Sequence, residues 1–264
     1  MNLELTDKLA LVSGSTKGIG FAIARQLAKE GARVVVNGRS EKSVADALAQ
    51  IRKEVSDAKL DGFAGDLSTA DATAALVQRF PRIDILVNNL GIFEPKAFEE
   101  IPDEEWRRFF EVNVLSGVRL SRAYLPGMKK RNWGRIVFIS SESAIQTPVE
   151  MIHYGMTKTA QLAIARGLAE STIGTKVTVN SVLPGPTASE GVTTFVSALA
   201  EKQKLAPKEF EKQFFQHARP SSLLQRFATP EEVANLVTFV CSPLSSATNG
   251  AALRVDGGVV RSIA

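Results

Sequence analysis

Short apolar runs rich in β-branched residues alternate with longer amphipathic stretches along almost the whole chain. Buried parallel strands have this continuous apolar pattern, and an amphipathic helix commonly connects one such strand to the next. The alternation therefore predicts a single α/β domain, doubly wound, with a seven-stranded parallel sheet and helices on both faces. The predicted strands are Leu9–Ser13, Arg33–Asn37, Leu60–Ala64, Ile83–Val87, Arg135–Ser140, Lys176–Val182 and Ala252–Val255.

Apolar residues at helical spacing place the connecting helices. No linker, repeat or low-complexity tract divides residues 1–264, so one domain is expected. The predicted helices are Gly18–Lys29, Glu41–Val55, Ala70–Arg79, Asp103–Met128, Ile152–Ser171 and Pro230–Ser242.

Residues 189–226 interrupt the strand–helix alternation. Phe195 with Leu199, and Phe210 with Phe214, lie four residues apart, which predicts a helical excursion. Two interpretations stay open. The excursion is either a surface helix pair that packs on the core, or a lid over a substrate pocket beyond the carboxyl ends of the strands.

Composition excludes several classes of function. The net charge is +4 and the basic residues are scattered, so no patch for nucleic acid is expected. The single cysteine, Cys241, excludes an internal disulfide. One cysteine and two histidines also argue against a metal site. We find neither a basic leader nor an apolar run of membrane-spanning length, so we expect a cytoplasmic protein without membrane contact.

A glycine-rich loop follows the first predicted strand and opens the first predicted helix. Glycines permit a tight turn and close approach of a phosphate to the backbone, and the helix N-terminus attracts anions. The spacing is not the usual G-x-G-x-x-G, but the position between strand and helix favours a Rossmann-like dinucleotide site over a simple turn. The loop consists of Gly14, Ser15, Thr16, Lys17, Gly18, Ile19 and Gly20.

The end of the second predicted strand indicates which dinucleotide binds. An NAD site normally has an acidic residue here for the ribose 2′-hydroxyl, whereas this chain has Asn37, Gly38 and Arg39. Arg39 and Lys17 suit a 2′-phosphate, so the sequence predicts a preference for NADP(H), with NAD(H) possible. The alternative is that both cations are solvated surface charges.

Tyr154 and Lys158 lie one turn apart on a predicted helix. A free phenol has a pKa near 10, and a nearby ammonium favours the phenolate and lowers that pKa. Such a tyrosine can exchange a proton with an alcohol or carbonyl oxygen while hydride moves.

Together these motifs resemble the single-domain branch of the short-chain dehydrogenase/reductase family, over nearly the whole chain and in the same order. The family usually has alanine where this chain has Leu90. The motifs that carry the resemblance are Gly14/Gly18/Gly20, Asp66, Asn88-Asn89-Leu90-Gly91, Asn113, Ser141, Tyr154/Lys158 and Pro184-Gly185.

The resemblance implies four catalytic residues. Tyr154 would be the acid/base, Ser141 would bond the substrate oxygen, and Lys158 would lower the pKa of the tyrosine and hold the nicotinamide ribose. Asn113 would anchor a water relay from Lys158. The other interpretations are a strand-end turn for Ser141 and a helix-capping or core amide for Asn113.

The resemblance also implies further cofactor contacts. Asp66 would accept a hydrogen bond from adenine, with Leu67 beside it, unless Asp66 serves the N-terminus of the next helix instead. Asn89 and Gly91 would line the adenosine side. The nicotinamide carboxamide would lie by Pro184, Gly185 and Thr187, and either Thr187 or Ser189 would contact phosphate.

The resemblance points to an enzyme, closest in kind to 3-oxoacyl-[acyl-carrier-protein] reductases and acting on an apolar carbonyl substrate. The alternatives are a dehydrogenase of a sugar, steroid or other secondary alcohol, and a nucleotide-sensing protein without turnover. A homotetramer or homodimer is expected by the same resemblance.

Overall fold

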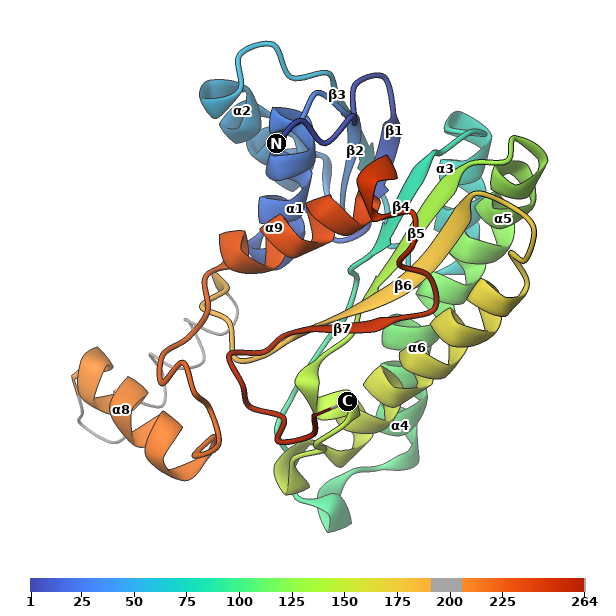
Figure 1. Ribbon diagram of the computed structural model, residues 1–264. Helices are drawn as coiled ribbons and strands as arrows, with labels where there is room; N and C mark the ends of the chain where they lie inside the picture. Colours follow the sequence, from blue (N-terminus) through green and yellow to red (C-terminus); the bar gives the residue numbers. More distant parts are fainter. Residues whose placement is uncertain (191–205, 264) are drawn as a thin grey trace.

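The computed structural model describes residues 1–190 and 206–263, and it contains one seven-stranded parallel sheet in the order β3-β2-β1-β4-β5-β6-β7. This confirms the predicted fold class (Figure 1). Five predicted strands differ from the observed ones by at most two residues at an end, and the third and the seventh agree throughout. The strands are β1 (Leu9–Val12), β2 (Arg33–Gly38), β3 (Leu60–Ala64), β4 (Ile85–Asn88), β5 (Gly134–Ile139), β6 (Val177–Pro184) and β7 (Ala252–Val255).

Helices cover both faces of the sheet, as predicted. Apolar side chains of α1, α2 and α9 form one buried cluster with the sheet, and those of α3, α5 and α6 form a second cluster on the opposite face (Figure 1). The helices are α1 (Gly18–Lys29), α2 (Glu41–Glu54), α3 (Ala70–Arg79), α4 (Asp103–Phe110), α5 (Ser116–Lys130), α6 (Ile152–Glu170), α8 (Pro207–His217) and α9 (Pro230–Cys241).

The expectation of one regular helix over Asp103–Met128 was wrong. α4 ends at Phe110, a π-helical turn covers Glu111–Leu115, and α5 then continues the same rod. Within this turn the Ser116 hydroxyl donates to the Val112 carbonyl oxygen at 2.6 Å. Because a π-turn inserts one residue into the helical repeat, it changes the direction of the side chains that it carries.

The helical excursion is confirmed in part. Phe210 and Phe214 lie on α8, which projects away from the layers of sheet and helices (Figure 1). Phe195 and Leu199 lie outside the described residues. Within the described ranges, no helix combines the length and apolarity that crossing a bilayer requires.

The order of the strands fixes where a ligand can bind. The chain winds from β1 outward to β3, then returns to β4 on the other side of β1, so the loops after β1 and β4 diverge. Such a reversal opens a crevice at the carboxyl ends of the strands. The Asn89 side chain joins the two loops by donating to the carbonyl oxygens of Ser13 and Gly14, each at 3.0 Å.

Two glycines provide a matched test of how closely the chain packs just after β6. A Cβ built on Gly185 would lie 2.5 Å from the Asp256 carbonyl oxygen, whereas one on Gly167, within α6, meets no described atom within 4 Å. We expect Gly185→Ala to lower the free energy of unfolding by about 1–3 kcal/mol. Gly167→Ala should raise it by up to about 1 kcal/mol, because alanine favours the helix. Urea denaturation measures both, and equal effects would contradict the packing at Gly185.

Candidate active site

Two adjoining cavities lie at the crevice. The larger has a volume of about 550 Å³ and the smaller of about 240 Å³. Ile19, Asn89, Gly91 and Ser189 line both of them. The cavities are therefore continuous across the end of the glycine-rich loop.

The smaller cavity is rich in glycine, with Gly14, Gly18, Gly20 and Gly91 in its lining. Gly14 and Gly18 have φ near +60°, which favours glycine, and a Cβ on Gly20 would lie 2.5 Å from the Gly14 carbonyl oxygen. No side chain caps the N-terminus of α1 at Lys17. Unpaired N–H groups at a helix N-terminus bind phosphate, so this cavity fits a dinucleotide pyrophosphate.

Ser15 and Asn37 hold this loop in shape. The Ser15 hydroxyl donates to the Val12 carbonyl oxygen at 2.7 Å and accepts from the Asn37 N–H at 2.9 Å. The Asn37 side-chain oxygen accepts from the Gly14 N–H at 3.0 Å, and its amide group donates to the carbonyl oxygens of Phe63 and Gly65 at 3.1 Å. This role of the buried amide was not expected from the sequence.

The end of β2 leaves no room for a carboxylate at residue 38. A Cβ on Gly38 would lie 2.4 Å from the Cγ2 methyl group of Thr16. Arg39 is exposed beside it, and the Lys17 ammonium lies 3.2 Å from the Glu190 carboxylate. The exposed guanidinium of Arg39 therefore places a positive charge at the end of β2, as the predicted contact with a 2′-phosphate requires.

Some of the remaining predicted cofactor residues line the cavities, and others do not. Gly91, Pro184, Gly185 and Thr187 line the larger cavity, and the Thr187 hydroxyl donates to the Gly185 carbonyl oxygen at 2.9 Å. Leu90 lines the smaller cavity.

Asp66 and Leu67 line neither cavity. The Asp66 carboxylate accepts from the Ser68 N–H at 3.0 Å and hydroxyl at 2.7 Å, just before Thr69 caps α3. Asp66 therefore takes part in the start of α3, as the alternative interpretation expected. Its contact with adenine stays a prediction. Leu67 is buried in the core.

Tyr154 and Lys158 project from α6 into the larger cavity, with the Lys158 nitrogen 5.5 Å from the centre of the Tyr154 ring. The Lys158 ammonium donates to the Ile139 carbonyl oxygen at 2.9 Å. Burial lowers the pKa of Lys158 to about 7.

The pKa of Tyr154 shifts in the direction opposite to the one expected from the sequence. Burial raises this pKa, the Glu142 carboxylate raises it further, and a hydrogen bond with Ser141 acts in the opposite direction. Desolvation of both groups outweighs the attraction between an ammonium and a phenolate. The phenol therefore keeps its proton at neutral pH.

Asn113 lies on the π-turn and is almost fully buried. Its side chain accepts from the Ile92 N–H at 2.7 Å and donates to the Ile92 carbonyl oxygen and the Thr157 hydroxyl, each at 3.0 Å. Its carbonyl oxygen accepts from Gln161, whose side-chain oxygen lies 3.4 Å from the Lys158 nitrogen. Gln161, which the sequence analysis missed, thus joins Lys158 to Asn113.

Ser141 is held by the next residue in the chain. Its hydroxyl donates to the Glu142 carboxylate, which also accepts from the Ser143 N–H at 2.9 Å and hydroxyl at 3.1 Å. The Ser141 oxygen accepts from the Ser143 N–H at 3.1 Å. Glu142 was missed because one acidic residue after a strand is ordinary; only its burial reveals the contact.

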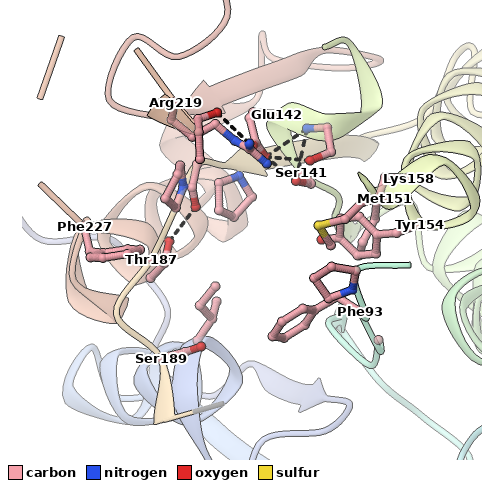
Figure 2. A pocket seen from close by; sticks show the side chains of 18 of the residues that line it. Phe93, Ser141, Glu142, Met151, Tyr154, Lys158, Thr187, Ser189, Arg219 and Phe227 are labelled. Carbon is pink, nitrogen blue, oxygen red and sulfur yellow. Dashed lines mark hydrogen bonds and ion pairs between the residues drawn. The ribbon is translucent and has the colours of Figure 1, made fainter. Parts of the chain in front are cut away.

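The rest of the larger cavity is mainly apolar. Phe93 and Met151 lie near Tyr154, and Phe227 lies across the cavity (Figure 2). Phe214 of α8 stacks on Phe227 with ring centres 5.1 Å apart. The helical excursion therefore supplies part of the cavity wall.

Comparison with known proteins agrees with this geometry. The family model described as "Enoyl-(Acyl carrier protein) reductase" matches residues 14–260. The chain is 53% identical to "Uncharacterized oxidoreductase YvaG" of Bacillus subtilis (strain 168), with full coverage of both chains. The chain belongs to the short-chain dehydrogenase/reductase family.

Two other members of the family are informative. The 3-oxoacyl-[acyl-carrier-protein] reductase FabG of Aquifex aeolicus (strain VF5) is 34% identical, over 98% of this chain and 100% of that protein. L-sorbose reductase from Gluconobacter frateurii, solved with NADPH and L-sorbose, superposes with a TM-score of 0.94 at 30% identity and full coverage of both chains. The present chain is accordingly an oxidoreductase of the short-chain dehydrogenase/reductase family.

The influence of Glu142 on Tyr154 can be measured directly. The chain has two tyrosines, so Tyr124→Phe leaves Tyr154 as the only phenol, at a cost of about 1 kcal/mol for the lost hydrogen bond to Phe80. In that background Glu142→Gln removes a negative charge, and we expect phenolate absorbance to appear at lower pH.

Glu170→Gln, at the exposed end of α6, is the control and should leave this titration unchanged. A midpoint that stays in place or rises with Glu142→Gln would contradict the electrostatic link between the two residues.

Proposed function

We propose that this chain is an NADP(H)-dependent enzyme that interconverts a ketone and a secondary alcohol, with Tyr154 as its acid/base. The observation that supports this most strongly is the meeting of Tyr154, Ser141 and Lys158 in one cavity, next to a glycine-rich cavity that fits pyrophosphate. When bound, the nicotinamide supplies or accepts the hydride.

In the proposed complex the glycine-rich loop holds the pyrophosphate. Arg39, together with Lys17, holds the 2′-phosphate, because a guanidinium suits that dianion. In this proposal the adenosine lies near Asp66, Leu67, Asn89 and Gly91. The carboxamide lies near Pro184, Gly185 and Thr187, and Ser189 lines both cavities.

The raised pKa of Tyr154 keeps the phenol in the protonated form that reduction uses. A protonated phenol can donate its proton to a carbonyl oxygen as that oxygen becomes an alkoxide. Lys158 then stabilises the phenolate, and Gln161 and Asn113 hold Lys158 in place. In the opposite direction the phenolate accepts the proton of the alcohol.

In this proposal Ser141 fixes the position of the substrate oxygen beside Tyr154. Its hydroxyl is directed to Glu142 before a substrate binds, so bonding the substrate requires this hydroxyl to rotate. Glu142 retains its bonds to Ser143 and Arg219 during that rotation.

The aromatic wall supports an apolar ketone, such as a 3-oxoacyl ester or thioester, as the substrate. A polyhydroxy ketone is the second candidate, supported by the charged groups at Glu142 and Arg219 and by the structural likeness to L-sorbose reductase. The ratio of kcat/KM for methyl acetoacetate to that for L-sorbose, with NADPH, decides between them.

We include a homotetramer or homodimer and a cytoplasmic location in this proposal. Light scattering at the assay concentration tests the assembly, and a monomer would remove that part without affecting the chemistry.

Replacement of Tyr154 by phenylalanine tests the chemistry. Tyr154→Phe removes the proton donor, so kcat should fall by about 10²- to 10⁴-fold. NADPH affinity, followed by cofactor fluorescence, should remain within a few-fold of the original. Tyr124→Phe is the control and should keep its turnover. Full turnover in Tyr154→Phe would exclude this mechanism, and cofactor binding without turnover in the unaltered protein would favour a nucleotide sensor.

Replacement of Arg39 by alanine tests the choice of cofactor. We expect Arg39→Ala to raise KM for NADPH by about tenfold and to change KM for NADH little, because only NADPH carries the 2′-phosphate. Arg52→Ala, an exposed arginine on α2, is the control. An equal loss with both cofactors would show that Arg39 does not read the 2′-phosphate.

A further inference from the structure

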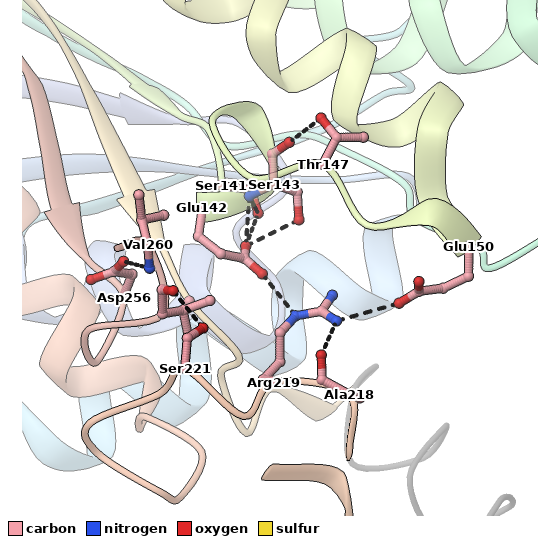
Figure 3. A network of polar contacts seen from close by, with 12 residues as sticks. Ser141, Glu142, Ser143, Thr147, Glu150, Ala218, Arg219, Ser221, Asp256 and Val260 are labelled. Carbon is pink, nitrogen blue, oxygen red and sulfur yellow. Dashed lines mark hydrogen bonds and ion pairs between the residues drawn. The ribbon is translucent and has the colours of Figure 1, made fainter. Parts of the chain in front are cut away.

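Three charged side chains meet on the wall of the larger cavity. Arg219 follows α8, Glu142 follows Ser141, and Glu150 belongs to a short helical turn, Val149–Met151, before α6. The Nε atom of Arg219 lies 3.3 Å from the Glu142 carboxylate, and its Nη1 atom lies 3.3 Å from the Glu150 carboxylate (Figure 3). We call these three residues the charged triad.

Most of the donor capacity of Arg219 is already used within the protein. Its Nη1 group also donates to the Ala218 carbonyl oxygen at 2.8 Å. The Nη2 group makes no bond that the described residues account for, so one edge of the guanidinium can still donate to a ligand. That edge suits an acceptor such as an ester carbonyl or a hydroxyl oxygen.

The charges of the triad do not balance. Two carboxylates face one guanidinium, which leaves a formal charge of −1. The side chains of Glu142 and Arg219 are only 6% and 12% exposed, so water screens their charges poorly, whereas Glu150 is 45% exposed.

The other charged or titratable groups in the described lining are Tyr154, Lys158 and His217. Lys158 donates to Ile139 and lies near Gln161, beneath Tyr154. His217, at the end of α8, forms no ion pair among the described residues. The described wall therefore presents no unpaired guanidinium to a substrate carboxylate.

We infer that the charged triad makes this site select uncharged ketones over keto acids, with the free edge of Arg219 donating to a neutral oxygen of the substrate. This deepens the proposed function and rests on it. An anionic substrate would lie beside two carboxylates of which the guanidinium compensates only one, and repulsion between like charges lowers the affinity for such a substrate.

The test uses two ketones with the same 3-oxobutanoyl skeleton, the neutral ester methyl acetoacetate and the anion acetoacetate. Affinity is measured by calorimetry on Tyr154→Phe with NADPH, so that selectivity does not depend on turnover, and kcat/KM is measured on the protein with Tyr154 intact. We expect both quantities to favour the ester by about 30-fold or more.

Glu150→Gln provides the decisive variant. It removes one negative charge and releases Nη1 of Arg219 for a carboxylate, so the preference for the ester should fall by about tenfold, mainly through tighter binding of acetoacetate. The matched control is Glu170→Gln, because Glu170 is also an exposed partner of an arginine, Arg166, but lies at the far end of α6. Its ratio should equal that of the parent protein.

The outcomes separate this inference from the proposed function. Equal binding of the two ketones, or a preference that Glu150→Gln leaves unchanged, overturns the inference even if NADPH-dependent reduction is observed. Selective binding of the ester without turnover of any ketone supports the inference and overturns the proposed function. Failure of both ketones to bind at millimolar concentration overturns both.

Discussion

The reversal of winding between β1 and β4 is the constraint on which the rest of the molecule depends. All seven strands run in one direction, so their carboxyl ends share one edge, and only at the reversal do neighbouring loops separate. The glycine-rich loop enters this opening from β1, and Asn89 after β4 holds it there. Residues far apart in the chain are thereby brought to one place without any dedicated binding domain.

Burial controls the chemistry of the site more strongly than attraction between neighbouring charges does. Tyr154 and Lys158 are both desolvated, so each favours its neutral form, and Glu142 adds to the effect on the phenol. A site tuned in this way gives up a proton readily only when a negative oxygen develops beside it. The same carboxylate also orients the Ser141 hydroxyl, which links the electrostatics of the site to its geometry.

Local pattern was sufficient to predict the strands, most helices and the pairing of Tyr154 with Lys158, because each depends on spacing along the chain. The place of Ser141 beside them was implied by the family resemblance. The π-turn at Glu111–Leu115 was not predictable, since an insertion of one residue into a long helix leaves no periodic signal. The direction of the Tyr154 pKa shift and the charged triad also escaped, because both depend on burial and on segments that are distant in sequence.

The close contact between Gly38 and Thr16 has a practical consequence for protein engineering. A common idea for redirecting such an enzyme to NAD(H) is to introduce a carboxylate at the end of β2. Here any side chain at residue 38 collides with the Thr16 methyl group, which itself belongs to the loop that shapes the pyrophosphate site. Retargeting the cofactor therefore has to remodel both positions together, and the two halves of the dinucleotide site cannot be redesigned independently.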